Sequence, residues 1–122
     1  MRRINVSLII IALLLDIGDM SFAQQVVPWD KADQYYDQDV TAEGIVVSTT
    51  IAKKSTACFL NFNSDWHQGL TAIIYRSNFL KFPPKPEEFY FGKKVQVTGF
   101  VQEYNGKPEI ILYDRSQIKI LN

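Results

Sequence analysis

The sequence of 122 residues contains a single cysteine, Cys58, and a single histidine, His67. One cysteine excludes a disulfide bond within the chain. A structural metal site usually needs three or four converging ligands, mostly cysteine and histidine, and the sequence does not supply them. We therefore predict no bound metal and no cofactor. Cys58 is expected to be a small buried apolar residue, and His67 a residue of a polar turn.

The residue patterns of common hydrolases are also missing. No Gly-x-Ser-x-Gly motif, which presents the nucleophile in many hydrolases, occurs in the chain. A metal-dependent nuclease needs clustered acidic residues, but Glu43 and Asp65 have no arginine beside them, and the acidic pair at 87–88 follows a run of prolines. We predict no catalytic residues and no enzymatic activity. A small nuclease is a lesser alternative, which requires these acidic residues to converge in the fold.

Neither sign of charge is in excess, since 13 basic residues balance 13 acidic ones. This balance argues against a strong, sequence-independent nucleic-acid binder, which needs surplus lysine and arginine to displace counterions. The charge is nevertheless uneven along the chain. Residues 24–43 carry a net charge of −4, and residues 44–122 carry a net charge of +4. The larger part of the chain is therefore mildly basic and follows an acidic leader.

No apolar run is long enough to span a bilayer, which takes about 20 residues. The longest, residues 6–15, follows Arg2 and Arg3 and precedes the small residues Ser21 and Ala23. This arrangement is typical of a secretory signal peptide cleaved after Ala23. We predict a signal peptide at 1–23, no stable membrane insertion after cleavage, and a secreted or periplasmic protein. An uncleaved anchor or an N-terminal core helix is the alternative.

Short runs rich in valine, isoleucine and threonine alternate with turn residues along the rest of the chain. Asn105-Gly106 is a strong signal for a tight hairpin turn. Gly44 predicts a bulge or bend within its strand. A run of prolines at 83–86 should exclude regular structure there. We predict strands at 39–52, 57–63 and 70–76, a short helix at 77–82 capped by Ser77, two strands joined by a turn within 89–114, and a closing strand at 116–121.

A short helix between the third and fourth strands is the element order of the OB fold. We predict an all-β fold: a five-stranded OB-fold barrel with a short helix between strands 3 and 4 and a helical N-terminal lead-in. The domain would span 39–122, after a leader helix at 24–38. In that helix Asp30 is the expected cap, and Trp29 shares a face with Ala32 and Tyr36.

The segments "VTAEGIVVS", "FLNFN", "LTAIIY" and "FGKKVQVTGFVQEYNGKPEIILYDRSQIKIL" together resemble an OB-fold domain of the nucleic-acid, anticodon-binding-like type. The resemblance is to small exported bacterial OB-domain proteins of unassigned function, and it covers residues 28–121. In anticodon-binding OB domains the second strand begins with a Phe that faces outward and stacks on a base. The resemblance implies that Phe59 and Asn61 face outward, whereas Leu60 and Phe62 fill the barrel.

OB folds bind ligands on the face of strands two and three, between the first-second and fourth-fifth loops. The candidate ligand-binding residues on that face are Phe59, Asn61 and one of Tyr75 and Arg76, and those in the loops are Lys53, Lys54, Tyr104, Asn105 and Lys107. Aromatic rings stack on bases, and lysines attract phosphate. The alternative is that the leader covers Phe59 through Trp29 or Tyr36, which leaves the lysines as ordinary solubilising charges.

Two functions are consistent with these patterns. The first is an exported, single-domain and monomeric binding module for single-stranded nucleic acid or another anionic polymer, bound weakly and in a salt-dependent way. The second is a protein-interaction or structural module of the cell envelope, in which an exposed sheet face docks on an envelope protein. A basic, aromatic face would favour the first function, and a neutral or apolar face the second.

Overall fold

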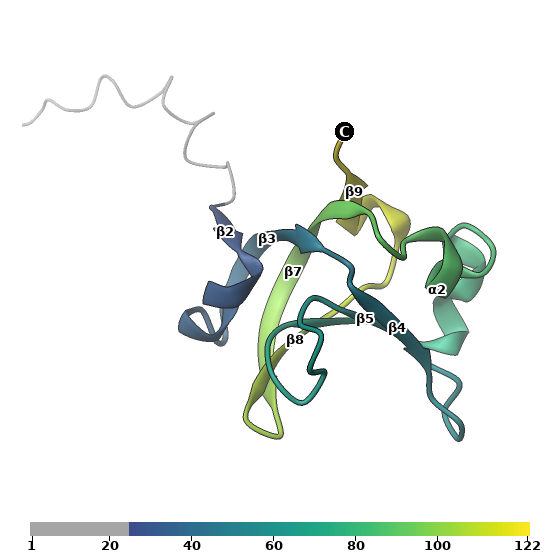
Figure 1. Ribbon diagram of the computed structural model, residues 1–122, viewed down its shortest axis with the longest axis horizontal. Coiled ribbons are helices and arrows are strands. Elements are labelled where there is room, and N and C mark those ends of the chain that lie inside the picture. Colours follow the sequence, from purple (N-terminus) through teal and green to yellow (C-terminus); the bar gives the residue numbers. More distant parts are fainter. Residues whose placement is uncertain (1–24) are drawn as a thin grey trace, which may run out of the picture.

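The computed structural model describes residues 25–122 (Figure 1). The predicted signal peptide, residues 1–23, lies outside the described residues. The elements in chain order are β2 (Val26–Pro28), the 3-10 helix η1 (Trp29–Gln34), β3 (Asp39–Ile45), β4 (Ser48–Ile51), β5 (Cys58–Asn61), β6 (Thr71–Ile74), the 3-10 helix η2 (Arg76–Lys81), the α-helix α2 (Pro86–Phe89), β7 (Lys94–Tyr104), β8 (Lys107–Ile111), the 3-10 helix η3 (Arg115–Gln117) and β9 (Ile118–Ile120).

The strands are hydrogen-bonded neighbours in the order β2-β3-β7-β8-β6-β5-β4, and β9 also pairs with β7. The long strand β7 joins the two halves of this sheet, because its residues 94–100 pair with β3 and its residues 101–104 pair with β8. Strands β3 and β4 stand near the two ends of this order, yet Val46 and Val47 alone separate them in the chain. The N–H of Val46 donates to the carbonyl of Lys93 before β7, whereas the N–H of Val47 donates to the carbonyl of Asn61 in β5. The chain therefore changes its pairing partner at these two residues.

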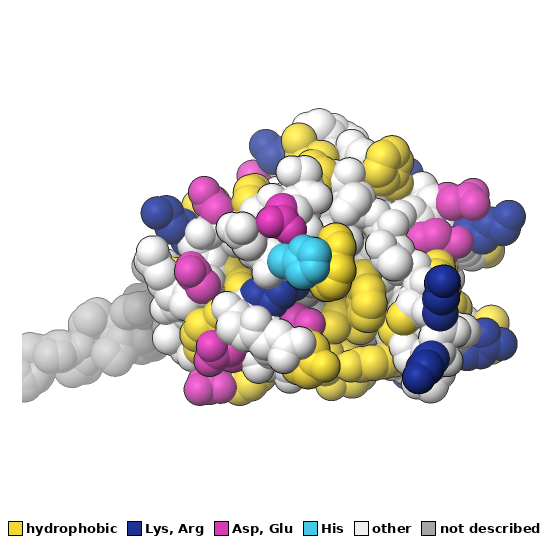
Figure 2. Space-filling model, turned by 60° about the horizontal axis from the view of Figure 1, so that its bottom comes forward, with side chains coloured by type: hydrophobic (Ala, Val, Ile, Leu, Met, Phe, Trp, Pro, Cys, Tyr) yellow, Lys and Arg dark blue, Asp and Glu magenta, His cyan; other side chains and the backbone are white. Residues whose placement is uncertain are grey.

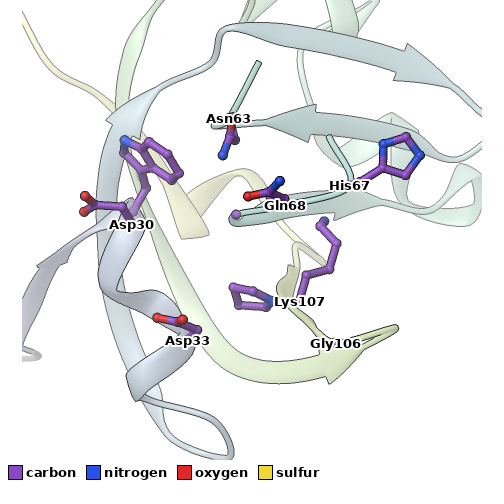
Figure 3. A pocket seen from close by; sticks show the side chains of 10 residues that line it. Asp30, Asp33, Asn63, His67, Gln68, Gly106 and Lys107 are labelled. Atoms are coloured by element: carbon purple, nitrogen blue, oxygen red, sulfur yellow. The ribbon is translucent and has the colours of Figure 1, made fainter. Parts of the chain in front are cut away.

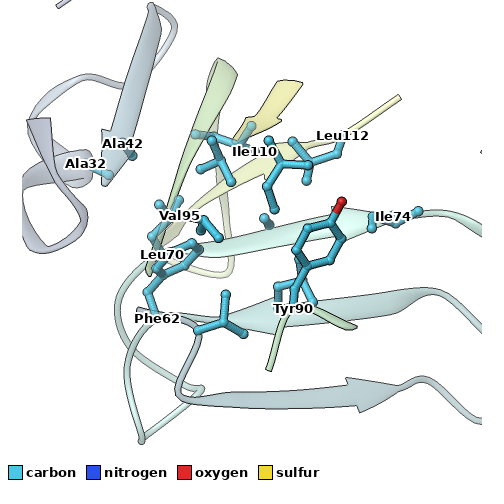
Figure 4. Close-up of a cluster of buried hydrophobic side chains, with 14 of the residues drawn as sticks. Ala32, Ala42, Phe62, Leu70, Ile74, Tyr90, Val95, Ile110 and Leu112 are labelled. Atoms are coloured by element: carbon cyan, nitrogen blue, oxygen red, sulfur yellow. The ribbon is translucent and has the colours of Figure 1, made fainter. Parts of the chain in front are cut away.

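The core lies on the inner side of the curved sheet and follows the alternation of side chains along each strand. Figure 4 shows part of this cluster, with Phe62 and Leu70 facing Val95, Ile110 and Leu112. The fully buried core side chains include Val40, Leu60, Phe62, Leu70, Ile74, Val95, Val97, Val101, Ile110 and Leu112. The predicted inward positions Leu60 and Phe62 are confirmed, as is the burial of Cys58. Burial raises the pKa of the Cys58 thiol to about 12, with a smaller contribution from the charge of Glu87.

The predicted all-β class is confirmed, but the prediction of five strands differs from the eight that the described residues form. The expected first strand, 39–52, is divided into β3 and β4 because the chain turns from one neighbour to another at Val46 and Val47. The other two strands, β2 and β9, are short additions that pair with β3 and β7. The Asn105-Gly106 hairpin is confirmed, and both residues have a positive φ, 52° and 76°, as a tight hairpin of this kind requires.

The structure corrects two predictions for residues 76–89. The helix expected at 77–82 is the 3-10 helix η2, which begins at Arg76, and its N-cap position is Tyr75 rather than Ser77. The proline run does not exclude regular structure, because the four-residue helix α2 begins at Pro86. Proline is well suited to the first turn of a helix, where its missing N–H has no intrahelical partner in any case. No helix of the described part has the length and apolar character that crossing a membrane requires.

The leader differs most from its prediction. Instead of one helix, it forms β2, which pairs in parallel with β3, followed by the 3-10 helix η1. Pro28 rather than Asp30 occupies the N-cap position of η1, and it makes no side-chain cap. Val27 and Ala32 belong to the core, so this segment packs as part of the same domain.

Gly44 explains how the leader can pack so closely. A methyl group at Gly44 would lie 2.5 Å from Cδ1 of Trp29 and 2.8 Å from Cδ1 of Phe62. The pairing of β3 with β7 continues without interruption through Gly44, which lies opposite Val95, so Gly44 does not form the predicted bulge or bend. Its role is to let the indole ring approach the sheet.

Candidate functional site

A groove of about 390 Å³ lies on the outer face of β5 and β6, on the side away from the core. Its walls are aromatic: Phe59 from β5, Trp66 from the loop between β5 and β6, and Tyr104 from the end of β7. Trp66 and Tyr104 are 57% and 58% exposed, so their rings are accessible to a ligand. The remaining lining residues are polar: Asn61, His67, Thr71, Asn105, Lys107 and Glu109.

The floor of the groove is held by a chain of hydrogen bonds that crosses four strands. Nδ2 of Asn61 in β5 donates to Oγ of Ser48 in β4 at 3.2 Å. The hydroxyl of Thr71 in β6 donates to Oδ1 of Asn61 at 3.0 Å. Nζ of Lys107 in β8 in turn donates to the Thr71 oxygen at 2.6 Å. Because Asn61, Thr71 and Lys107 are all buried, these contacts satisfy polar groups that water does not reach freely.

Two residues at the groove floor, Lys107 and Glu109, carry opposite charges. Both are buried, with exposed fractions of 9% and 8%. Burial lowers the pKa of Lys107, and the charge of Glu109 partly opposes this effect. Burial likewise raises the pKa of Glu109, against a hydrogen bond from Gln102 and the charge of Lys107. The groove floor is therefore nearly neutral and offers both donors and acceptors.

The loop between β5 and β6 is organised around Asp65. The backbone N–H of His67 and its ring nitrogen Nδ1 lie 3.1 and 3.0 Å from Oδ1 of Asp65, and Gln68 donates to the other carboxylate oxygen at 3.2 Å. These contacts with His67 and Gln68 hold the pKa of Asp65 below its usual value. The His67 ring stacks on the ring of Trp66, with centroids 3.8 Å apart. His67 is thus a turn residue, as predicted, and it braces an aromatic wall of the groove.

Of the nine candidate ligand-binding residues named from the sequence, the structure brings five together in this groove: Phe59, Asn61, Tyr104, Asn105 and Lys107. Asn61 faces the groove, as predicted, but is buried there. Lys107 was expected in an exposed loop, and instead it is the first residue of β8 and is buried, because its ammonium is held by Thr71.

The other four candidates, Lys53, Lys54, Tyr75 and Arg76, do not line the groove. Lys53 and Lys54 are exposed in the turn between β4 and β5, and Tyr75 and Arg76 follow β6. Arg76 lines a separate hollow together with Lys85. Cys58 pairs with Ile74 across β5 and β6, so all four residues gather at one end of these two strands.

The alternative that the leader covers Phe59 is wrong. Neither Trp29 nor Tyr36 lines the groove. The Trp29 ring lies instead over two glycines, where added methyl groups at Gly44 and Gly69 would meet it at 2.5 and 2.8 Å. Among residues 25–122, nothing from the leader covers the sheet face around Phe59.

Trp29 borders a second hollow of about 350 Å³, which adjoins the groove because His67 and Lys107 line both. Figure 3 shows this hollow, with Asp30 and Asp33 of η1 on one side, His67 and Lys107 on the other, and Gln68 between them. Within residues 25–122, no basic group lies within 4.0 Å of either carboxylate. No set of three His, Cys, Asp or Glu side chains in this part of the chain is arranged to hold a metal ion.

Sequence reasoning did not select Trp66, His67, Thr71 or Glu109 for the groove. Thr71 and Glu109 could have been chosen from strand alternation, because they lie two residues from Ile73 and Lys107 on outward-facing positions. No sequence signal indicates that the loop between β5 and β6 lies near the hairpin between β7 and β8, because their proximity depends on the parallel pairing of β6 with β8.

No family model matches the sequence, and no curated protein matches it either. Many solved structures are similar in fold, among them the following three. An asparaginyl-tRNA synthetase from Pyrococcus horikoshii is 15% identical with a TM-score of 0.52, over 79% of this chain and 23% of that one. An aspartyl-tRNA synthetase from Entamoeba histolytica is 12% identical with a TM-score of 0.54, over 84% of this chain and 22% of that one. The structure of yeast Stn1 and Ten1 is 12% identical with a TM-score of 0.54, over 91% of this chain and 70% of that one.

The fold is of the OB type. The chain spans less than a quarter of the two synthetases, and at these identities the similarity concerns the fold alone. The element order is compatible with this fold, since the helical segments η2 and α2 lie between β6 and β7.

Proposed function

We propose that this protein is a non-catalytic OB-fold module that binds single-stranded nucleic acid, or another anionic polymer, in the aromatic groove. The observation that carries the proposal is that Phe59, Trp66 and Tyr104 share one open groove with Lys107. Aromatic faces stack on bases of any sequence, and each stacked base contributes about 1–3 kcal/mol. The fold that the chain shares with two tRNA synthetases supports a nucleic acid as the class of ligand.

The electrostatic contribution to binding should be small but measurable. The floor is close to neutral because Lys107 and Glu109 oppose one another. The exposed cations near the groove are Lys53, Lys54 and Arg76, at one end of β5 and β6. If these three contact phosphates, the logarithm of the affinity should fall with the logarithm of the salt concentration with a slope of about −2.

We also propose that the protein acts as a monomer, outside the cytoplasm. Residues 2–23, with their basic start, apolar run and small residues at the end, support export. We infer further that β3 and β4 act as one strand of a closed five-stranded barrel. The two-residue connection through Val46 and Val47 supports this inference.

The test is the binding of the purified protein to labelled single-stranded DNA and RNA at two salt concentrations. Phe59→Ala should weaken binding by about tenfold or more, the value of one stacked base. The matched control is Phe91→Ala, which removes an exposed phenyl ring outside the groove and should leave the affinity unchanged. The double charge reversal Lys53→Glu/Lys54→Glu should weaken binding and flatten the salt dependence, whereas Arg115→Glu/Lys119→Glu should do much less.

Absence of binding at low salt would refute the proposal. The protein-interaction module of the cell envelope would then be the function to test, because an exposed aromatic groove with a neutral floor also suits a protein partner. Binding that survives Phe59→Ala and Tyr104→Ala would show that nucleic acid binds, but at a different surface.

A further inference from the structure

The two ends of the groove carry opposite charge. At one end, Lys53 and Lys54 lie in the turn that directly precedes β5, and Arg76 follows β6. Because Cys58 pairs with Ile74, the start of β5 and the end of β6 lie side by side. All three cations are exposed, and this pairing places their segments beyond the Phe59 end of the two strands. Arg76 lines a hollow there that also contains Lys85 and Glu87.

The opposite end of the groove opens onto acidic residues. There the groove meets the hollow that contains Asp30 and Asp33, with His67 and Lys107 at the boundary. Both carboxylates are exposed, and in the described part of the chain neither has an ion-pair partner. In Figure 2 acidic side chains predominate to the left of His67, whereas most side chains of charge beyond the strip of hydrophobic surface to its right are lysine and arginine, with acidic side chains beside them.

This charge distribution has opposite effects on a phosphate at the two ends of the groove. A phosphate that leaves the groove past Phe59 approaches Lys53, Lys54 and Arg76, which attract it. A phosphate that leaves past His67 enters the hollow beside Asp30 and Asp33, which repel it. Both effects act within about 8 Å, the screening length at physiological ionic strength. A strand that passes through the groove would need a phosphate on each side, whereas a strand that ends in the groove needs one only on the basic side.

We propose that the groove recognises the end of a single strand: the terminal nucleoside stacks among Phe59, Trp66 and Tyr104, and the backbone leaves toward Lys53, Lys54 and Arg76. This inference rests on the proposed function. The terminal nucleoside carries no phosphate beyond it, so it fits against the acidic hollow without repulsion. Its base edge meets the donors and acceptors of Asn105, Lys107 and Glu109 at the groove floor.

The test compares an unlabelled linear oligothymidylate with the same oligomer ligated into a circle, at low salt. Binding is followed by the fluorescence of the protein, since Trp66 lines the groove. We expect the linear form to bind about tenfold more tightly than the circle, the scale of repulsion from two nearby carboxylates in a largely aqueous site. Asp30→Asn/Asp33→Asn should raise the affinity for the circle to nearly that of the linear form.

The matched control is Asp37→Asn/Asp39→Asn, which removes the same charge from exposed positions of the same segment outside both the groove and the acidic hollow. It should preserve the preference for the linear form. Equal binding of the two forms, or a preference that Asp30→Asn/Asp33→Asn leaves intact, would overturn end recognition while the proposed function stands. Failure of both forms to bind would overturn the proposed function and, with it, this inference.

Terminal phosphates provide a second measurement. A phosphate added to the strand end that occupies the groove should lie beside Asp30 and Asp33 and should weaken binding by about tenfold. A phosphate on the opposite end should have little effect. The comparison of 5′-phosphorylated and 3′-phosphorylated oligomers therefore identifies which end is recognised. If neither phosphate weakens binding, end recognition is wrong.

Discussion

The ammonium nitrogen of Lys107 donates a hydrogen bond of 2.6 Å to the hydroxyl oxygen of Thr71, beneath the aromatic groove. The two residues are far apart in the sequence and lie on β8 and β6, which pair in parallel. The same hydroxyl donates to Asn61, so one threonine satisfies a buried cation and a buried amide. The polar floor of the groove thus depends on a single small side chain.

Replacement of Thr71 by valine tests this dependence. Valine keeps the shape but leaves the ammonium of Lys107 and the amide oxygen of Asn61 without this partner. We expect the free energy of unfolding to fall by about 1–3 kcal/mol, the cost of unsatisfied buried polar groups. Urea denaturation measures the change. Thr50→Val, at an exposed position of β4, is the control and should change stability by less than about 0.5 kcal/mol. Equal effects of the two substitutions would contradict the prediction.

Glu109 should make stability depend on pH. Burial raises its pKa above the usual value, so the folded protein holds this proton more tightly than the unfolded chain does. Ionisation of Glu109 therefore opposes folding: the penalty is absent below the pKa of the unfolded chain and complete above the raised pKa of the folded protein. We expect Glu109→Gln to raise the free energy of unfolding at pH 7 by about 1 kcal/mol.

The gain from Glu109→Gln should disappear as the pH falls below about 4, where the wild-type carboxyl is protonated in both states. Urea denaturation at several pH values measures it. Glu103→Gln, at an exposed position of β7, is the matched control and should show neither effect. A loss of stability at pH 7 would mean that the attraction between Glu109 and Lys107 outweighs the cost of burying the carboxylate.

Gly44→Ala should strain the contact between the leader and the sheet. The added methyl group would lie within 3 Å of both Trp29 and Phe62, so at least one ring has to move. We expect a loss of about 1–3 kcal/mol, typical of overpacking a core. In a double-mutant cycle, the cost of Gly44→Ala should shrink when Trp29 is replaced by leucine. Additive effects of the two substitutions would show that the ring does not limit the space at this position.

The Cys58 thiol should be unreactive in the folded protein. It is fully buried, and burial raises its pKa to about 12. The thiolate is the reactive form of cysteine, and at pH 8 the folded protein contains very little of it. We expect a thiol reagent at pH 8 to label the native protein only at the rate of unfolding, and to label it rapidly in denaturant. Rapid labelling without denaturant would show that the core opens locally around β5.

Much of the strand pattern is legible in local sequence. The resemblance implied that Leu60 and Phe62 fill the core, and alternation placed them on one face of the strand. Asn105-Gly106 marked the hairpin, because this signal depends on adjacent residues. The leader was predicted less well. Its apolar positions are also compatible with a helix, and nothing local to them indicates that residues 26–28 pair with β3.

The candidate site was also predicted only in part. Phe59 and Asn61 were selected from the resemblance, and Tyr104 and Lys107 from the loops that flank the binding face of OB folds. The structure gathers all four in one groove. Lys53, Lys54, Tyr75 and Arg76 were selected in the same way, yet they lie at the end of β5 and β6. Alternation predicts which face of the sheet a residue occupies. It does not predict how close that residue lies to the loops of other strands.

The order of apolar and polar residues was sufficient for the all-β class, the core face of the strands and the tight hairpin, since each follows from the geometry of a few neighbouring residues. The groove and its opposite charges at either end were decided by the assembled sheet. Parallel pairing of β6 with β8 brings Lys107 to Thr71, and packing of Trp29 on Gly44 brings Asp30 and Asp33 beside His67. These contacts join segments separated by tens of residues, and their formation depends on the burial of a shared core, which no local pattern encodes.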